Sequence, residues 1–179
     1  MLYTKLFEAE KNPFTKDFIE TIAKWQNYGI SSSTDPFIKV LNKLIIPSKY
    51  KKCDSEIYRV MAIEKDLLTK KPFKIKTNIF SSWSYDLKIV ETYSKSGYFI
   101  EFLSDLKNPI KVFFKYKPSN KDVFINLHTL WSDKDFINAI KKIEETGYFF
   151  DEGLELGDIQ KEVILNQIIL KESNILKTE

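Results

Sequence analysis

The hydrophobic pattern of the chain changes its period near Glu56, and this change restricts the fold more than any other feature of the sequence. Before it, the segment NPFTKDFIETIAKWQNYG carries large apolar residues at helical spacing and is closed by Gly29. These residues are Phe14, Phe18, Ile22 and Trp25. After it, EIYRVMAI and FKIKTNIFSSWS have the alternation and the β-branched and aromatic content that are typical of strands. We therefore expect helices first and a mostly antiparallel sheet afterwards, which is an α+β fold.

Further helices are predicted by turn and capping signals. Asp35 is suited to cap a second helix that begins with Pro36 and stops at Pro47. A helix is expected from Tyr85 to about Lys95, capped by Ser84 and ended by Gly97. Another is expected in SDKDFINAIKKIEETG, from Ser132 to Gly147. Strands are predicted in the remaining apolar runs, which are YFIEFL, PIKVFFKYK, DVFINLHTL, QKEVILNQ and IILKE.

Length and composition favour one domain over residues 1–179, with a helical part at 1–50 and a β core at about 55–172. The hydrophobic fraction is 43%, and 14 Phe, 9 Tyr and 3 Trp supply a sizeable core. No apolar run approaches the ~20 residues of a membrane span. The first residues, MLYTKLFEAEKN, lack the apolar core of a secretory signal. We expect a cytoplasmic monomer without membrane association.

Several kinds of chemistry are disfavoured by what the sequence lacks. Cys53 and His128 are the only residues of their types, so an internal disulfide is excluded and a metal site made of Cys and His is nearly so. No glycine-rich phosphate loop or HExxH motif is present. The net charge of +3 is too small to indicate nucleic-acid binding by itself. We expect no metal.

Polar residues interrupt three of the predicted strands. The first is Arg59, the only arginine among 28 cationic residues, at the start of an apolar strand. The second is the pair Ser82 and Ser84, which would share one face of a strand while Trp83 enters the core on the other. The third is Gln160 with Glu162, which would likewise share a face. Each could be simple surface alternation, or together they could form the floor of a polar site.

Taken in chain order, these residues resemble the mono-ADP-ribosyltransferases of the Arg–Ser–Glu class. That family has an aromatic-Arg pair on a first strand, Ser-x-Ser on a second and [Glu/Gln]-x-Glu on a late strand. The corresponding residues here are Tyr58-Arg59, Ser82-Trp83-Ser84 and Gln160-Lys161-Glu162. Phage transferases that modify host proteins are similar in further stretches, namely SWSYD before a helix, PIKVFFKYKP with DVFINL, and EVIL. The resemblance covers roughly residues 55–172 and implies an ADP-ribosyltransferase-type split β-sandwich with helices packed on it.

The resemblance also implies roles for individual residues. Glu162 would hydrogen-bond the ribose 2′-hydroxyl of NAD and stabilise the positive charge that develops when the nicotinamide–ribose bond breaks. Ser82 would hold that carboxylate, and Arg59 would meet the pyrophosphate. Ser84 and Val60 complete the expected NAD-binding residues. Val60 stands where the family usually has Gly, and its side chain restricts that wall of the site.

The implied acceptor depends on Gln160. In the family, Glu at this position accompanies arginine acceptors, whereas Gln accompanies asparagine, glutamine or nucleobase acceptors. Gln160 is therefore expected to position an acceptor by amide hydrogen bonds, on a protein or a nucleic acid of the host or target cell. The preceding loop GYFFDEGLELGD, with Tyr148, Phe149 and Phe150, would help recognise the target or else fill the core.

Three other functions remain open. Water could replace the macromolecular acceptor, which would make the protein an NAD glycohydrolase. The chain could instead be a binding module that keeps the fold without turnover, or a nucleic-acid-binding domain, for which a steep salt dependence of association would be diagnostic. The leading hypothesis is a transferase that suits a phage-encoded host modifier or an intracellular toxin.

Overall fold

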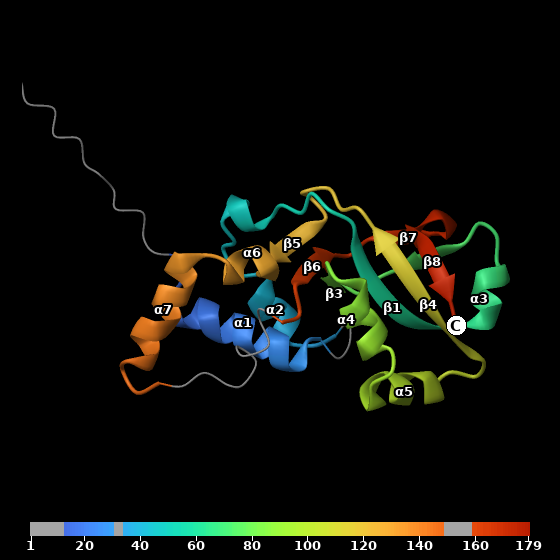
Figure 1. Cartoon of the computed structure of the whole chain (residues 1–179), viewed down its shortest axis with the longest axis horizontal. Helices are drawn as coiled ribbons and strands as arrows, with labels where there is room; N and C mark the ends of the chain where they lie inside the picture. The colour runs from blue at the N-terminus through green and yellow to red at the C-terminus, as the bar shows by residue number, and fades with distance from the viewer. Residues whose placement is uncertain (1–12, 31–33, 149–158) are drawn as a thin grey trace, which may run out of the picture.

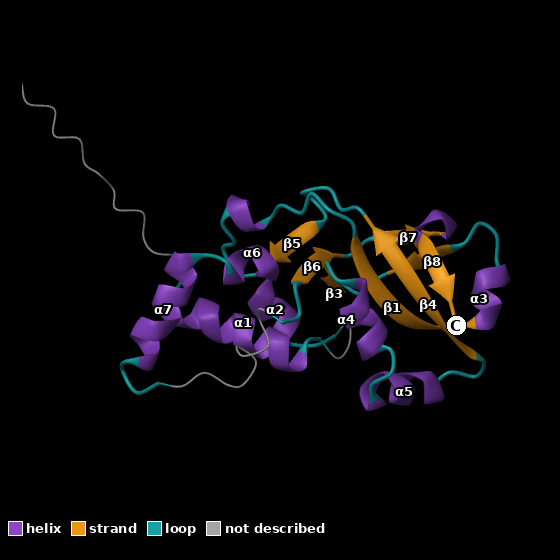
Figure 2. Cartoon of the chain, viewed as in Figure 1, coloured by secondary structure: helices purple, strands orange, loops and turns teal. Residues whose placement is uncertain are grey.

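The structure, a computed structural model, describes residues 13–30, 34–148 and 159–179. Within these ranges the chain is α+β, with helices at the N-terminus and a mainly antiparallel sheet after residue 56 (Figures 1 and 2). The helices are α1 (Lys16–Tyr28), α2 (Phe37–Leu41), α3 (Lys65–Thr69), α4 (Leu87–Tyr93), α5 (Gly97–Ser104), α6 (Leu127–Trp131) and α7 (Lys134–Glu144), with 3-10 turns η1 (Ser48–Tyr50) and η3 (Glu172–Asn174). The strands are β1 (Ile57–Glu64), β2 (Lys74–Lys76), β3 (Phe80–Ser84), β4 (Pro109–Tyr116), β5 (Val123–Asn126), β6 (Glu162–Asn166), β7 (Ile169–Lys171) and β8 (Ile175–Thr178).

Six strands form one sheet in the order β5-β6-β3-β1-β4-β8, and β2 pairs with β7 in a separate two-stranded sheet. Neighbouring strands of both sheets are antiparallel. The pairing of β1 is uneven: it is in register with β4 along its whole length, but it pairs with β3 at one position, Tyr58 opposite Ser84. The two halves of the sheet are therefore joined by little main-chain pairing at the junction of β1 and β3.

The N-terminal helix α1 forms where the sequence predicts it. The Thr15 side chain caps its first turn by accepting a hydrogen bond from the Phe18 amide at 3.2 Å, and Gly29 ends it with a φ of 59°. Its apolar face joins α2, α6 and α7 in a core that also covers Phe80, Ile125 and Ile164 of the sheet. In Figure 1 these four helices gather at one end of the molecule, around β5 and β6.

Two further apolar clusters lie on opposite faces of β1 and β4. One contains Trp83, Val163 and Phe114, and the other joins Val60 and Phe113 to α4 and α5. Trp83 is 1% exposed, which confirms the prediction that it enters the core between the two serines. The clusters fix the strand register, because a slip of one residue would move each buried side chain to the opposite face and away from its packing partners.

Two predicted elements differ from the structure between residues 85 and 104. The predicted helix after the serines is shorter, and Asp86 rather than Ser84 caps it, accepting from the Lys88 amide at 2.9 Å. Gly97 does not close that segment but begins α5, so the strand predicted in YFIEFL is wrong. The Ser96 side chain caps α5 by accepting from the Phe99 amide at 3.3 Å. A short aromatic run cannot be assigned by periodicity alone, and this cap decides it.

Other boundaries shift for similar reasons. The strand predicted in DVFINLHTL ends at Asn126, whose side chain caps α6 by accepting from the Thr129 amide at 3.1 Å. His128 therefore lies on a helix rather than a strand. Asp133, not Ser132, caps α7. The sequence patterns do not predict strand β8. Among the described residues, no helix is long and apolar enough to cross a membrane.

Candidate functional site

The three strands that carry the interrupting polar residues are neighbours in the sheet. Arg59 lies on β1, Ser82 on β3 and Glu162 on β6, and the sheet order places β3 between the other two. Ser84 is directly opposite Glu162, and Ser82 is opposite Ile164. Cross-strand partners share a face of the sheet, so both serines lie on the same face as Glu162. Arg59 is opposite Phe114 of β4 and reaches β3 through its guanidinium, which contacts the main chain of Ser82.

Glu162 is a buried carboxyl group with one oxygen engaged and one oxygen free of hydrogen bonds. Its side chain is 4% exposed, and Trp25 of α1 donates from Nε1 to Oε1 at 2.9 Å. Oε2 is buried and accepts no hydrogen bond from the described residues. A buried acceptor without a partner is rare and costly in folded proteins. Oε2 is therefore ready to accept a hydrogen bond from a ligand hydroxyl.

The pKa of Glu162 is raised, because burial penalises the ionised form. The nearby Ser82 hydroxyl, the Trp25 indole and the positive charge of Arg59 each act in the opposite direction and favour the carboxylate. Ser82 is near enough to support the charge, but its hydroxyl does not form a hydrogen bond of ordinary geometry with Oε2. Burial is the largest of these influences, so the pKa of the carboxyl group lies above its ordinary value.

Arg59 bridges the gap between β1 and β3. Its Nη1 donates to the main-chain carbonyl oxygen of Ser82, beside the single position at which the two strands pair. Its Nε is buried and has no hydrogen-bond partner among the described residues. Burial lowers the pKa of Arg59, while Tyr93 of α4 and Glu162 raise it. The guanidinium therefore retains an unused donor that could meet an anionic oxygen.

Ser84 has a different role from Ser82. Its hydroxyl donates to the main-chain oxygen of Gln160 at 2.9 Å and accepts from the Asp86 amide at 3.1 Å. The same turn is held by the Tyr85 amide, which donates to the carbonyl oxygen of Lys161 at 3.1 Å. Ser84 thereby fastens the start of β6 to the corner between β3 and α4. Ser82, by contrast, is exposed.

The sequence predicts Gln160 on the same strand face as Glu162, and the resemblance implies Val60 as part of the wall of the NAD site. Gln160 precedes β6 in a turn, because Lys161 has a φ of 47° and breaks the strand alternation between Gln160 and Glu162. The prediction that a strand extends through Gln160 is wrong. Val60 is 5% exposed and packs in the cluster with α4 and α5, opposite Phe113 of β4. Its side chain is therefore part of the core, beside Arg59 in the sequence.

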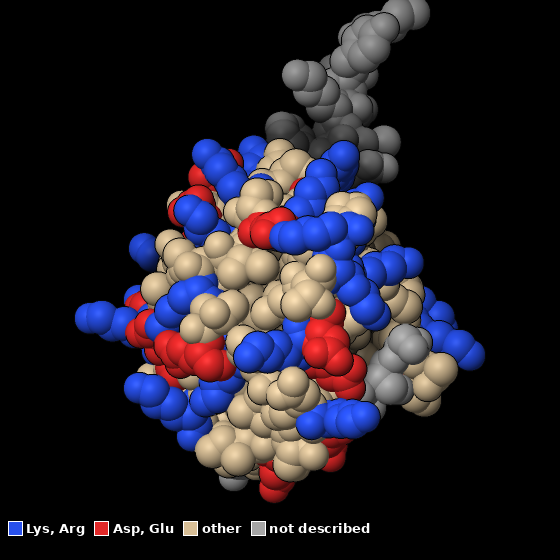
Figure 3. All heavy atoms as spheres, turned by 90° about the vertical axis from the view of Figure 1, so that its right-hand side faces the viewer, with Lys and Arg blue, Asp and Glu red and all other residues tan. Residues whose placement is uncertain are grey.

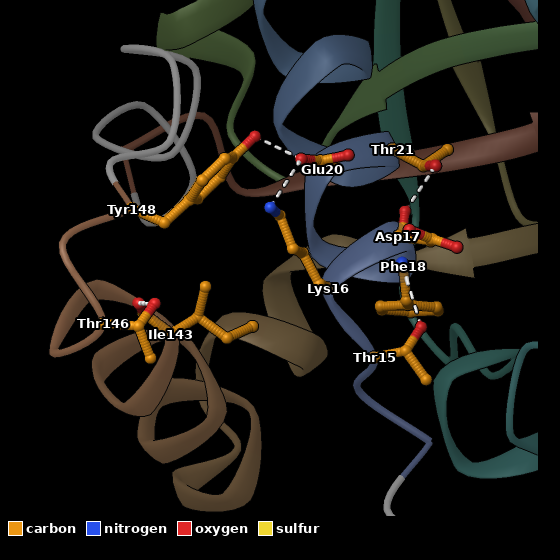
Figure 4. Close-up of polar contacts among 9 residues, drawn as sticks. All are labelled: Thr15, Lys16, Asp17, Phe18, Glu20, Thr21, Ile143, Thr146 and Tyr148. Carbon is orange, nitrogen blue, oxygen red and sulfur yellow. Dashed lines mark hydrogen bonds and ion pairs between the residues drawn. The ribbon is translucent and has the colours of Figure 1, made fainter.

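Helix α1 also holds the described end of the predicted target-recognition loop. The Tyr148 hydroxyl donates to Glu20, and Lys16 lies over the Tyr148 ring, 3.5 Å from its centroid (Figure 4). Lys16 and Glu20 also form an ion pair at 3.9 Å. Phe149, Phe150, Gly153 and Gly157 lie outside the described residues. One helix therefore contacts both Tyr148 and, through Trp25, the carboxyl group of Glu162.

Sequence reasoning missed Trp25 and Tyr93 as neighbours of the site. Trp25 was assigned only to the apolar stripe of a helix, yet a buried indole N–H usually needs an acceptor. This need for an acceptor is the one feature of the sequence that points to a polar role for Trp25. The sequence does not show which residue is the acceptor. Tyr93 lies on α4, with its ring edge-on to Phe99 at 5.6 Å between centroids. No pattern in the sequence marked it as a neighbour of Arg59.

The remaining candidates give no comparable arrangement. Cys53 is buried, and burial raises the pKa of its thiol. His128 lies beside the ring of Tyr85, with 5.4 Å between ring centroids. The described ranges contain no group of His, Cys, Asp and Glu residues that could hold a metal ion. On the face shown in Figure 3, Lys and Arg side chains are interspersed with acidic and uncharged residues and form no continuous basic stripe.

Comparisons of the chain with protein-family models, with curated proteins and with solved structures found no match.

Proposed function

We propose that the protein is an NAD-dependent mono-ADP-ribosyltransferase that transfers ADP-ribose to a macromolecular acceptor and releases nicotinamide. The observation that carries the proposal is the buried carboxyl of Glu162, whose Oε2 has no hydrogen-bond partner among the described residues, on a strand two places from the lone arginine. A hydroxyl-bearing, anionic ligand fits these two groups, because one is an unused acceptor and the other an unused donor. NAD carries both a ribose hydroxyl and a pyrophosphate.

Glu162 has the environment that this reaction needs. NAD supplies a nicotinamide–ribose bond whose cleavage develops positive charge on the ribose. A carboxylate that binds the 2′-hydroxyl stabilises that charge more strongly as it grows than it does beforehand. Burial strengthens the interaction because the local dielectric is low. Ser82 supports the ionised state of Glu162 from the adjacent strand.

Arg59 is the residue proposed to bind the pyrophosphate. A guanidinium can make two parallel hydrogen bonds to phosphate oxygens and stays charged in partly buried surroundings. Its present partner is a main-chain carbonyl, which a phosphate oxygen can replace at Nη1 while Nε gains a partner. Val60 restricts the backbone next to it, and Ser84 keeps the turn before β6 in place.

We further propose that the fold is a split β-sandwich of the ADP-ribosyltransferase type. The single paired position between β1 and β3 supports such a split, and Arg59 contacts the Ser82 carbonyl beside it. The proposed acceptor is a protein or a nucleic acid. Gln160 lies next to the site in a turn, where its amide could orient that acceptor.

The test is a release and transfer assay with NAD labelled separately in the nicotinamide and adenylate parts. The wild-type chain is expected to release nicotinamide and to attach the adenylate label to protein or nucleic acid of a bacterial lysate. If the adenylate label is attached to neither protein nor nucleic acid and free ADP-ribose is the product, the enzyme is a glycohydrolase. If a folded wild-type protein releases no nicotinamide, both enzymatic functions are wrong, and the non-catalytic binding module is the remaining hypothesis.

A further inference from the structure

Trp25 makes a contact with Glu162 that the proposed reaction does not by itself require. The indole lies on the inner face of α1, is 4% exposed, and donates from Nε1 to Oε1 of Glu162 at 2.9 Å. Its ring meets Phe80 of β3 edge-on, with 6.5 Å between centroids and an interplanar angle of 89°. The contact joins residues that are 137 positions apart, from the N-terminal helix to β6.

The contact distinguishes the two oxygens of the carboxyl group. An indole N–H can only donate, so Oε1 is occupied as an acceptor while Oε2 has no partner among the described residues. The ring itself is packed in the core formed by α1, α2, α6 and α7, and it cannot rotate away without opening that core. One oxygen of the carboxyl group is therefore held by a donor that the core keeps in place.

We infer that Trp25 is a positioning residue, which holds Glu162 through Oε1 and leaves Oε2 as the oxygen that receives a ligand hydroxyl. The inference rests on the proposed function for its catalytic consequence, but the contact has measurable consequences of its own. It makes the N-terminal helix α1 part of the active site rather than only a cover for the sheet.

The groups that face Glu162 come from three elements. Arg59 on β1 supplies a positive charge, Ser82 on β3 supplies a hydroxyl, and Trp25 on α1 supplies the indole donor, all of which favour the carboxylate. Tyr93 on α4 interacts with Arg59. Burial opposes them and raises the pKa of Glu162. Loss of the Trp25 donor must therefore raise this pKa further.

The first experiment compares Trp25→Phe with Trp131→Phe. Both variants keep an aromatic ring, and Trp131 packs against the same core, where its Nε1 donates to Gln26 Oε1 at 3.3 Å. Trp25→Phe is expected to lower kcat roughly tenfold or more with little change in KM for NAD. The acid limb of the pH profile of kcat is expected to move to higher pH, whereas Trp131→Phe leaves it in place. An unmoved acid limb in Trp25→Phe would overturn the inference.

The second experiment uses the wild-type chain and does not depend on activity. The three tryptophans give three indole N–H signals in a nitrogen–proton NMR spectrum, which Trp83→Phe and Trp131→Phe assign by elimination. The Trp25 signal is expected to shift with pH as Glu162 ionises, and to lose that titration in Glu162→Gln. A Trp25 signal that does not respond to Glu162→Gln would overturn the inference, whether or not Trp25→Phe folds.

The two experiments separate the contact from the proposed function. A titrating Trp25 signal in a chain that never consumes NAD supports the positioning contact and shows that the transferase assignment is wrong. If the chain consumes NAD but the Trp25 signal does not change in Glu162→Gln, the transferase function is supported and the positioning role of Trp25 is wrong.

Discussion

Ser84 lies directly opposite Glu162 in the ladder between β3 and β6, and its hydroxyl is committed to the carbonyl oxygen of Gln160 at 2.9 Å. The two serines of the Ser-Trp-Ser segment are thereby assigned different tasks. Ser84 holds the turn from which β6 begins, while Ser82, on the same face and exposed, is left to act on the carboxyl group.

Ser84→Ala is expected to destabilise the protein by about 1–2 kcal/mol, because the main-chain groups of Gln160 and Asp86 lose a buried partner. Urea unfolding measures this change. Ser104→Ala is the matched control, since the Ser104 hydroxyl donates to the Glu101 carbonyl in an exposed helix. Equal unfolding free energies for the two variants would show that Ser84 does not fasten the turn.

Ser82→Ala is expected to leave stability nearly unchanged, because the side chain is exposed. It removes a hydroxyl that favours the carboxylate, so the pKa of Glu162 rises and the acid limb of NAD turnover moves to higher pH. The measurement is the pH profile of nicotinamide release. A profile that coincides with the wild type would contradict the role given to Ser82.

Arg59→Lys is expected to raise KM for NAD about tenfold, because a lysine ammonium cannot reproduce the two-pronged contact of a guanidinium with phosphate. Steady-state kinetics with varied NAD checks this. Lys115→Ala is the control: it removes a positive charge from the neighbouring strand β4, where Lys115 pairs with Glu56 at 3.8 Å. Similar KM values in the two variants would indicate a general charge effect instead.

Asp133 gives a prediction that concerns stability rather than activity. It caps α7 and accepts from Lys49 and from the Tyr50 hydroxyl, both at 2.7 Å, and these contacts lower its pKa to about 2. Its ionised form therefore stabilises the fold fully above the ordinary value of 3.8, and this contribution is lost as pH falls through about 2. Asp133→Ala should cost about 1 kcal/mol near neutral pH.

The acid dependence is the decisive part of that prediction. The difference in unfolding free energy between wild type and Asp133→Ala should shrink between pH 4 and pH 2, a window set by the pKa values 3.8 and about 2. Asp105→Ala, at an exposed position after α5, serves as the control. A difference that does not change over this range would refute the capping account.

The sequence predicted the polar residues of the site better than their surroundings. Arg59, Ser82 and Glu162 stand out because each interrupts an apolar strand, and local alternation is a property of the sequence. The order β6-β3-β1 could not be derived, since it depends on pairing between distant segments. The sequence does not mark Trp25 as a site residue, because its position in the apolar stripe of a helix is that of an ordinary core residue. Only the folded chain brings Glu162 to its indole N–H.

The errors have local causes. Residues 98–103 read as a strand because aromatic and aliphatic residues dominate them, yet the Ser96 cap starts a helix there. The alternation of side chains predicts Gln160 on the same strand face as Glu162. The positive φ of Lys161 ends that alternation, so the strand begins only at Glu162. In both places a main-chain conformation at a boundary outweighs the hydrophobic pattern.

Glu162→Gln also reports on the burial of the carboxyl group. The pKa of Glu162 is raised in the folded state, so the folded chain binds the proton more tightly than the unfolded chain. The unfolding free energy of the wild type should therefore fall as pH rises from the ordinary value of 4.5 through the raised folded value. Glu162→Gln should lack this decline and should be as stable as the wild type or more so near neutral pH, because a neutral amide replaces a buried charge.

The central claim is tested most directly by nicotinamide release from labelled NAD, measured side by side for the wild type and Glu162→Gln. The account predicts release by the wild type, transfer of the adenylate label to a macromolecule, and a loss of at least about 10²-fold in the variant while its circular dichroism is unchanged. Equal rates of release in the two folded proteins, or none in the wild type, would contradict it.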